Sequence, residues 1–235
     1  MRKLLVMALC LAAGLALAGT FTKPEVTLDV PDGWVEVPGE VLQQFHEELK
    51  RQAPLAQVPK YDYAFQGAAG PPWLSYPYVL VKVTPSGRPT EHDLETLPTI
   101  DLNSKVREQG DNWGNIMKDS SLGQMRYDKS ANVVWISSKS NVANIGPVAG
   151  ISGVIPTERG FVELHGYAKE SDFPRHLPTF QKIITGARVA PDLLYKPRWT
   201  DKLGPFARLD FKLLGFALAV GVLIAVFVIF RRRQS

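Results

Sequence analysis

Cysteine is almost absent from this sequence, since only one residue, Cys10, occurs among 235. It lies in an apolar N-terminal run that is typical of a removable targeting segment, so the mature chain would contain no thiol. This excludes disulfide bonds and thiol chemistry, and the folded state must be stabilised by an ordinary hydrophobic core. Leu9 stands where a lipidation motif needs a small residue, so we expect no lipid on Cys10.

The folded part of the chain also lacks an excess of positive charge, although the whole sequence has a formal net charge of +4 and an isoelectric point near 9.1. Seven of the 27 Lys and Arg residues and one of the 23 Asp and Glu residues lie in residues 1–18 or 208–235. Residues 19–207 therefore carry 20 basic and 22 acidic side chains, a net charge of about −2. We expect no nucleic-acid partner for such a domain.

Recognisable catalytic, metal and cofactor motifs are missing as well. The histidines lack ligand spacing such as H-x-x-x-H, no serine lies in G-x-S-x-G, and the glycines at 146, 150 and 153 do not precede a helix as in a phosphate loop. These glycines suggest a bulge or close packing instead. The sequence therefore assigns no catalytic, cofactor-binding or metal-binding residue and does not indicate an enzyme. The side chains concerned are His46, His92, His165 and His176, and Ser137, Ser138, Ser140 and Ser152.

His165 is the histidine of most interest because Glu163 lies on the same face of the same predicted strand. The simpler interpretation is a surface histidine or one that packs on the sheet.

The N-terminus has the three parts of a secretory signal peptide. Arg2 and Lys3 form a positive region, an apolar run of about 15 residues follows, and residues 16–18 (Ala-Leu-Ala) form an A-x-A cleavage site. The alternative, an uncleaved anchor helix, would need a longer apolar stretch to cross the hydrocarbon core. We predict a signal peptide over residues 1–18 and export of the remainder.

A second apolar run, LLGFALAVGVLIAVFVIF over residues 213–230, contains no charge. At about 1.5 Å per residue it gives roughly 27 Å of helix, which matches a bilayer core. Three arginines follow it as a stop-transfer cluster, and Trp199 precedes it among aromatic residues of the kind found at membrane interfaces. We predict a juxtamembrane linker over residues 190–212, a single transmembrane helix over 213–230 and a cytoplasmic tail over 231–235.

Between these ends, residues 19–189 are expected to form one extracytoplasmic domain. Strands are predicted where apolar residues alternate, and helices where they recur every three or four residues. The expected fold class is α+β, a mainly antiparallel sheet flanked by helices. The predicted strands cover residues 25–30, 34–37, 61–65, 73–84, 125–127, 133–137, 145–155 and 161–167; the predicted helices cover 39–52, 90–97 and 173–184, and 98–119 is polar and partly helical.

Two stretches resemble a known family. Residues 28–34 (LDVPDGW) resemble an apolar strand that ends in a Pro-x-x-Trp turn, and residues 161–167 with the apolar positions Phe173, Phe180, Ile183 and Ile184 resemble a last strand and terminal helix. Together they are similar to the PsbP-like fold, which is shared by an extrinsic photosystem II subunit, Ran-binding nuclear import factors and many exported bacterial proteins. The resemblance covers residues 25–188 and implies protein binding rather than catalysis. The membrane anchor departs from that family, and no photosystem or Ran contact residues are recognisable.

The sequence therefore favours a membrane-tethered extracytoplasmic module that binds or helps to assemble a protein partner in the cell envelope. The alternative is an envelope hydrolase whose site is not recognisable from sequence. A pocket joining His165 to a serine and a carboxylate would favour the hydrolase, whereas a shallow surface with exposed aromatic residues would favour binding. The aromatic residues in question, for which a role in the core is the simpler interpretation, are Tyr61, Tyr63, Trp73, Tyr76 and Tyr78.

Overall fold

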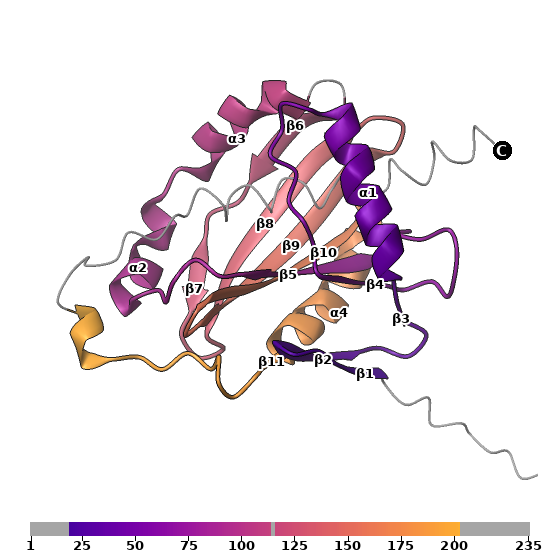
Figure 1. The fold of residues 1–235 in the computed structure, drawn as a ribbon. Helices are drawn as coiled ribbons and strands as arrows, with labels where there is room; N and C mark the ends of the chain where they lie inside the picture. Colours follow the sequence, from indigo (N-terminus) through magenta and orange to yellow (C-terminus); the bar gives the residue numbers. More distant parts are fainter. Residues whose placement is uncertain (1–18, 114–115, 203–235) are drawn as a thin grey trace, which may run out of the picture.

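The computed structural model describes residues 19–113 and 116–202 (Figure 1). The predicted signal peptide (1–18), transmembrane helix (213–230) and cytoplasmic tail (231–235) lie outside these residues. Within the described part of the chain, no helix is both long enough and apolar enough to cross a bilayer.

The main body is an eight-stranded sheet in which all paired strands are antiparallel. Its spatial order is β3-β4-β5-β10-β9-β8-β6, and β7 pairs with β8. Short turns join β8 to β9 and β9 to β10, so the centre of the sheet is built from consecutive hairpins. The strands are β3 (Val35–Glu36), β4 (Tyr63–Gln66), β5 (Tyr78–Thr84), β6 (Met117–Leu122), β7 (Arg126–Asp128), β8 (Val133–Val142), β9 (Gly146–Thr157) and β10 (Gly160–Lys169).

Three helices cover one face of this sheet. Helix α1 (Gly39–Gln52) packs Leu42, Phe45 and Leu49 against Tyr78 and Leu80 of the sheet. Helices α2 (Glu91–Thr96) and α3 (Leu102–Gly110) cover the other end of the same face, as Figure 1 shows. This face therefore carries two separate hydrophobic clusters, one beneath α1 and one beneath α2 and α3.

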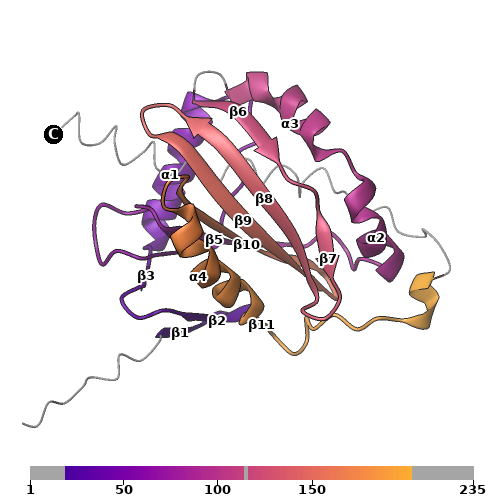
Figure 2. The ribbon, with the colours of Figure 1, turned by 180° about the vertical axis from the view of Figure 1, so that it is seen from behind.

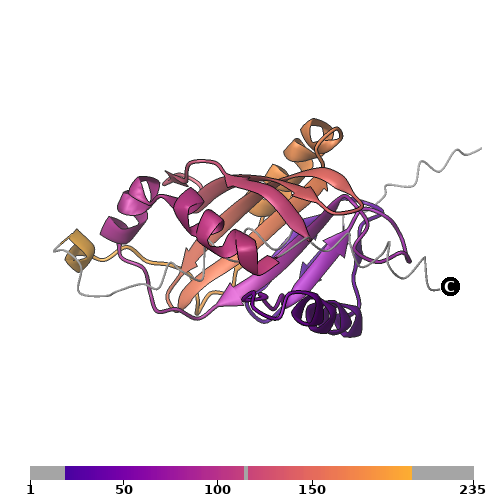
Figure 3. The same cartoon turned by 90° about the horizontal axis from the view of Figure 1, so that it is seen from above.

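The opposite face is covered by α4 (Phe173–Thr185) and a small sheet of β1 (Gly19–Thr22), β2 (Val26–Val30) and β11 (Arg188–Val189), which Figure 2 shows from behind. Seen from above in Figure 3, α1 and α4 lie on opposite sides of the sheet.

Helix α4 approaches the sheet closely because glycines lie beneath it. A Cβ added at Gly153 would come within 2.1 Å of Ile184, and one added at Gly166 would come within 2.5 Å of Phe180. The predicted close strand packing is seen at Gly150, where an added Cβ would come within 2.5 Å of Ser138 and 2.6 Å of Tyr167 on the two neighbouring strands, whereas at Gly153 the close neighbour is helix α4. Because both faces of β10 are covered, its alternate side chains are all buried.

The described residues confirm the α+β class and a mainly antiparallel sheet. Helix α1 has the predicted bounds, and β10 shows the predicted register, with Val162 and Leu164 on the α4 side and Glu163 and His165 on the other. The prediction of a strand over 73–84 was wrong for its first residues, since β5 begins only at Tyr78. Proline lacks the N–H that a ladder needs, and Pro77 stands just before the strand begins.

Residues 190–202, the first part of the expected linker, pack against the domain. The Ala190 N–H donates to the Glu25 carbonyl at 2.9 Å, and the Glu158 N–H donates to the Leu193 carbonyl at 2.9 Å. The segment ends in a short 3-10 helix, η3 (Trp199–Lys202), which lies beside α2. We call residues 190–202 the docked segment.

Candidate functional site

A cluster of buried polar side chains lies on the helix-covered face of the sheet between the two hydrophobic clusters. Ser152 of β9 and His165 of β10 are direct cross-strand partners, and Ser152 Oγ lies 2.8 Å from His165 Nδ1. His165 Nε2 lies 3.5 Å from Glu163 Oε2, which is longer than a typical hydrogen bond. Ser152, His165 and Glu163 all have 0% exposure. Together with Lys82 and Thr84 they form what we call the polar cluster.

Glu163 is ionised in this cluster. Its Oε1 atom accepts a hydrogen bond from the Thr84 hydroxyl and lies 3.4 Å from Lys82 Nζ, a cross-strand neighbour on β5. Burial alone would raise the pKa of the Glu163 carboxyl, but His165, the charge of Lys82 and the Thr84 hydroxyl outweigh it and hold that pKa below its usual range. A buried carboxylate is tolerated here because the Lys82 ammonium and the Thr84 hydroxyl both lie against its Oε1 atom.

The sequence of contacts from serine to histidine to carboxylate resembles a hydrolase triad, but its position does not suit catalysis. Ser152 is wholly buried, so no substrate carbonyl reaches its hydroxyl in this structure. It also sits in mid-strand between Ile136 of β8 and His165 of β10, where its backbone N–H belongs to the sheet ladder rather than to an oxyanion site. The cluster is a buried polar network in the sheet.

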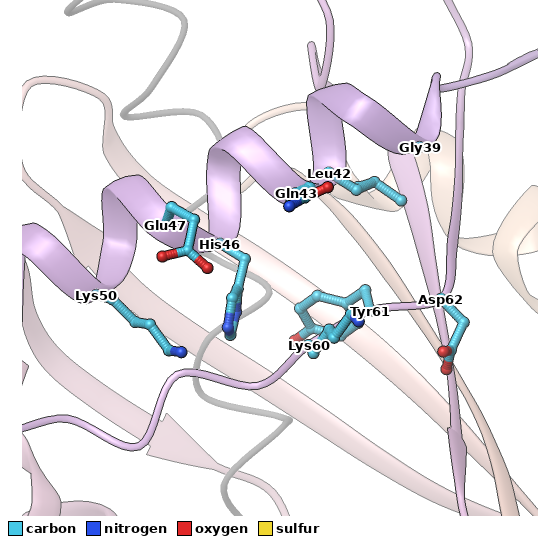
Figure 4. A pocket seen from close by; sticks show the side chains of 9 residues that line it. All are labelled: Gly39, Leu42, Gln43, His46, Glu47, Lys50, Lys60, Tyr61 and Asp62. Carbon is cyan, nitrogen blue, oxygen red and sulfur yellow. The ribbon is translucent and has the colours of Figure 1, made fainter.

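A surface groove of about 540 Å³ runs along α1 next to this cluster (Figure 4). Buried Leu42 and Tyr61 line it, and charged side chains of both signs stand around it. We call this the α1 groove. It is lined by Gly39, Leu42, Gln43, His46, Glu47 and Lys50 from α1 and by Lys60, Tyr61 and Asp62 from the chain that leads into β4.

Hydrogen bonds to the backbone fix two side chains of the α1 groove. His46 Nδ1 lies 3.2 Å from the carbonyl oxygen of Pro59. A carbonyl only accepts, so Nδ1 carries the proton and a neutral His46 has its lone pair on Nε2. The Asp62 carboxylate accepts a hydrogen bond from the Val83 N–H at 2.7 Å. Donor and acceptor groups therefore hold defined positions along the groove.

Tyr61 connects the groove to the polar cluster. Its side chain lines the groove, and its ring packs edge-on against the His165 ring at a centroid distance of 5.9 Å and an angle of 75°. Burial, reinforced by Tyr167 and the charge of Glu163, raises the pKa of the Tyr61 hydroxyl well above its usual value. A neutral tyrosine thus separates the solvent-filled groove from the ionised cluster.

The other serines and histidines considered in the sequence lie at separate places in the structure. Ser137 is exposed, whereas Ser138 and Ser140 are buried in β8 and the Ser140 hydroxyl donates to Ser120 at 2.9 Å. His46, unlike His92 and His176, lines the α1 groove. Among the described residues, no three His, Cys, Asp or Glu side chains come together as a metal site would require.

The aromatic residues considered as an interaction surface belong to the core. Tyr61 and Tyr78 are buried, and Tyr76 stacks on Tyr78 at a centroid distance of 5.0 Å. Trp73 and Tyr76 pack at the edge of the cluster beneath α1, and Tyr63 packs against the cluster beneath α4. The interpretation as core is confirmed. Sequence reasoning missed the groove because its lining comes from α1 and from the chain that leads into β4, and no local pattern shows that these two stretches lie side by side.

Comparison with known proteins bears on the fold alone. No protein-family model matches this chain, and no curated protein sequence matches it. The solution structure of cyanobacterial PsbP (CyanoP) from Synechocystis sp. PCC 6803 is similar, with a TM-score of 0.50 and 12% sequence identity over 77% of this chain and 97% of that chain. The chain therefore has a PsbP-like fold, as the sequence resemblance predicts.

Proposed function

We propose that this protein is a membrane-tethered extracytoplasmic module that binds or helps to assemble a protein partner in the cell envelope, and that the α1 groove is its contact surface. The observation that supports this most directly is the groove itself, an open surface lined mainly by polar and charged side chains, two of which are fixed by hydrogen bonds to the backbone. The PsbP-like fold is consistent with such a role, since its known members act mainly by binding proteins.

The chemistry of the groove suits a polypeptide segment. Lys50 and Lys60 supply positive charge, and Glu47 and Asp62 supply negative charge, so neither a purely acidic nor a purely basic partner is favoured. The Tyr61 ring is buried and closes the base of the groove, so the exposed charged and amide side chains of α1 supply most of the contact surface. A partner strand or helix with mixed charges and one apolar side chain would complement this surface.

The test is position-specific photo-crosslinking in native membranes. A photo-reactive residue replaces Gln43, an exposed groove residue, and in a matched control it replaces Gln181, an exposed residue of α4 on the opposite face. We expect one envelope protein to be captured from position 43 and not from position 181. The double variant Lys50→Glu with Lys60→Glu should lose this crosslink while keeping its thermal unfolding temperature.

Equal capture from both positions, or capture from position 43 that survives the charge reversal, would contradict the assignment of the groove. Tethering is tested separately by washing membranes. Release of the protein by high salt alone, without detergent, would contradict a transmembrane anchor.

The alternative function, an envelope hydrolase, is favoured by one observation, the hydrogen bond between Ser152 and His165 beside Glu163. Such an enzyme would require Tyr61 to move so that the groove reaches Ser152. Turnover of a model ester by the parent protein that Ser152→Ala abolishes would support this alternative. Absence of turnover from both proteins, together with the crosslink at position 43, would support binding.

A further inference from the structure

A partly buried arginine, Arg88, makes several hydrogen bonds that attach the docked segment to the domain. Arg88 donates to both carboxylate oxygens of Asp201, at 2.8 Å from Nη1 and 2.7 Å from Nη2. Its Nη2 also donates to the Lys196 carbonyl at 2.6 Å, and its Nε donates to Glu158 at 3.1 Å. A bidentate pair of this kind fixes orientation as well as distance. We call Arg88, Glu158 and Asp201 the clasp.

Further contacts strengthen the clasp. The Arg88 guanidinium lies 4.9 Å from the centre of the Tyr195 ring, and this ring is buried. Hydrogen bonding to Arg88 lowers the pKa of the Asp201 carboxyl, so this carboxylate stays charged at neutral pH. Arg198 reaches back to Glu158 at 2.5 Å. The docked segment is thus attached by several charged groups and not only by its covalent connection.

The docked segment carries exposed hydrophobic side chains. The structure exposes three large hydrophobic side chains among the described residues, namely Leu55 at 77%, Leu194 at 49% and Trp199 at 79%. Two of these three, Leu194 and Trp199, belong to the docked segment. The clasp fixes the backbone on either side of Trp199 through Arg198 and Asp201, so the indole projects from a rigid support. Tryptophan with an apolar body and one N–H donor is suited to the boundary between lipid and water.

We propose that this edge of the domain, formed by the docked segment beside α2, lies against the lipid bilayer with the Trp199 indole in the interface. This inference rests on the proposed transmembrane anchor. Ten residues, 203–212, separate the docked segment from the apolar run at 213, and even fully extended they span only about 35 Å. Exposed Lys196 adds positive charge three residues before Trp199, which suits lipid phosphate groups. The clasp thereby sets which face of the domain turns toward the membrane and leaves the α1 groove for a partner.

The test uses the full-length protein reconstituted in phosphatidylcholine vesicles whose acyl chains are brominated near the headgroup, because bromine quenches tryptophan fluorescence at short range. The measurement compares the parent protein with Trp199→Phe, while Trp34, Trp73, Trp113 and Trp135 supply the background emission. We expect the parent to show a quenchable component that Trp199→Phe loses. Flotation of the vesicles after an alkaline wash reports separately on the anchor.

The outcomes distinguish this inference from the tether on which it rests. If the protein floats with the vesicles but Trp199→Phe is quenched to the same extent as the parent, the membrane-facing edge is wrong and the tether stands. If the protein does not float, both are wrong.

The role of the clasp is tested with Arg88→Met, which should lose most of the quenchable emission while remaining anchored. Should this variant not fold, Asp201→Asn removes the same charge pair with little change in shape. Full quenching in a folded clasp variant would show that the clasp does not orient the domain.

Discussion

The ion pair between Lys82 and Glu163 in the polar cluster leads to a quantitative prediction. Replacing Lys82 should lower the free energy of unfolding more than replacing Glu163. Glu163 has 0% side-chain exposure and Lys82 has 15%. Lys82→Met would leave a fully buried carboxylate without its lysine, whereas Glu163→Gln would leave an ammonium group that reaches water. Breaking a buried pair from one side costs about 3–5 kcal/mol, and the remaining Thr84 hydrogen bond places Lys82→Met near the lower end, at about 3 kcal/mol.

Glu163→Gln should cost less, about 1–2 kcal/mol, because the amide oxygen still accepts from Thr84. The double variant should resemble Glu163→Gln, since no buried charge remains to be compensated. The assay is urea unfolding of the full-length protein in mild detergent, followed by tryptophan fluorescence. A double-mutant cycle then gives the coupling energy between the two side chains.

The stability difference between the parent and Lys82→Met should also depend on pH, in a direction that follows from the pKa of Glu163. The folded-state pKa of Glu163 lies below its ordinary value of 4.5, so its contribution to stability is complete above that pH and is lost as the pH falls through the folded-state value. Lys82→Met removes one of the groups that lower this pKa, so the Glu163 carboxyl of the variant takes up a proton at a higher pH than that of the parent. The difference in the free energy of unfolding between the parent and Lys82→Met should therefore narrow as the pH falls toward the ordinary glutamate value of 4.5.

A loss below about 1 kcal/mol for Lys82→Met, or a greater loss for Glu163→Gln than for Lys82→Met, would refute this reasoning. Either result would mean that water or another group already compensates the Glu163 carboxylate.

Three further predictions concern packing, capping and the docked segment. Gly153→Ala should lower the free energy of unfolding by about 1–3 kcal/mol, because the added methyl group would come within 2.1 Å of Ile184. The control is Gly39→Ala, whose methyl group would have no neighbour within 4 Å and which should be neutral or stabilising in the same urea assay. Thr90→Ala should cost about 1 kcal/mol, because it removes the capping box of α2, and a loss indistinguishable from zero would argue against that cap. Arg88→Met should make the docked segment sensitive to limited trypsin digestion under conditions in which the parent resists, as mass spectrometry of the fragments would show; resistance of both proteins would contradict the clasp.

Local sequence patterns predicted most of the helices and strands. Helix α1 was predictable because its apolar residues recur at helical spacing after Pro38, and the β9 and β10 hairpin was predictable because alternation and a turn coincide. The small sheet was only half predicted, since β2 has an alternating pattern while β11 is two residues long and pairs across the whole domain. Strands that short are stabilised by their neighbours and leave no periodic signal.

The candidate site was much less predictable. The sequence placed His165 and Glu163 on one face of a strand, which is a local consequence of period two. It did not identify Ser152 as the residue that meets His165, because that contact depends on the register between two strands. It likewise did not indicate the α1 groove, whose two sides come from separate elements.

What could be obtained from the linear order of residues is therefore what depends on near neighbours, namely the α+β class, the faces of the central strands and the apolar character of both termini. What required the three-dimensional arrangement is the burial of the polar cluster, the position of Tyr61 between that cluster and solvent, and the docking of residues 190–202 through Arg88. The reason is physical. Periodicity records which side of an element avoids water, whereas ion pairs such as that of Arg88 and Asp201 join residues 113 positions apart and exist only after the chain has folded.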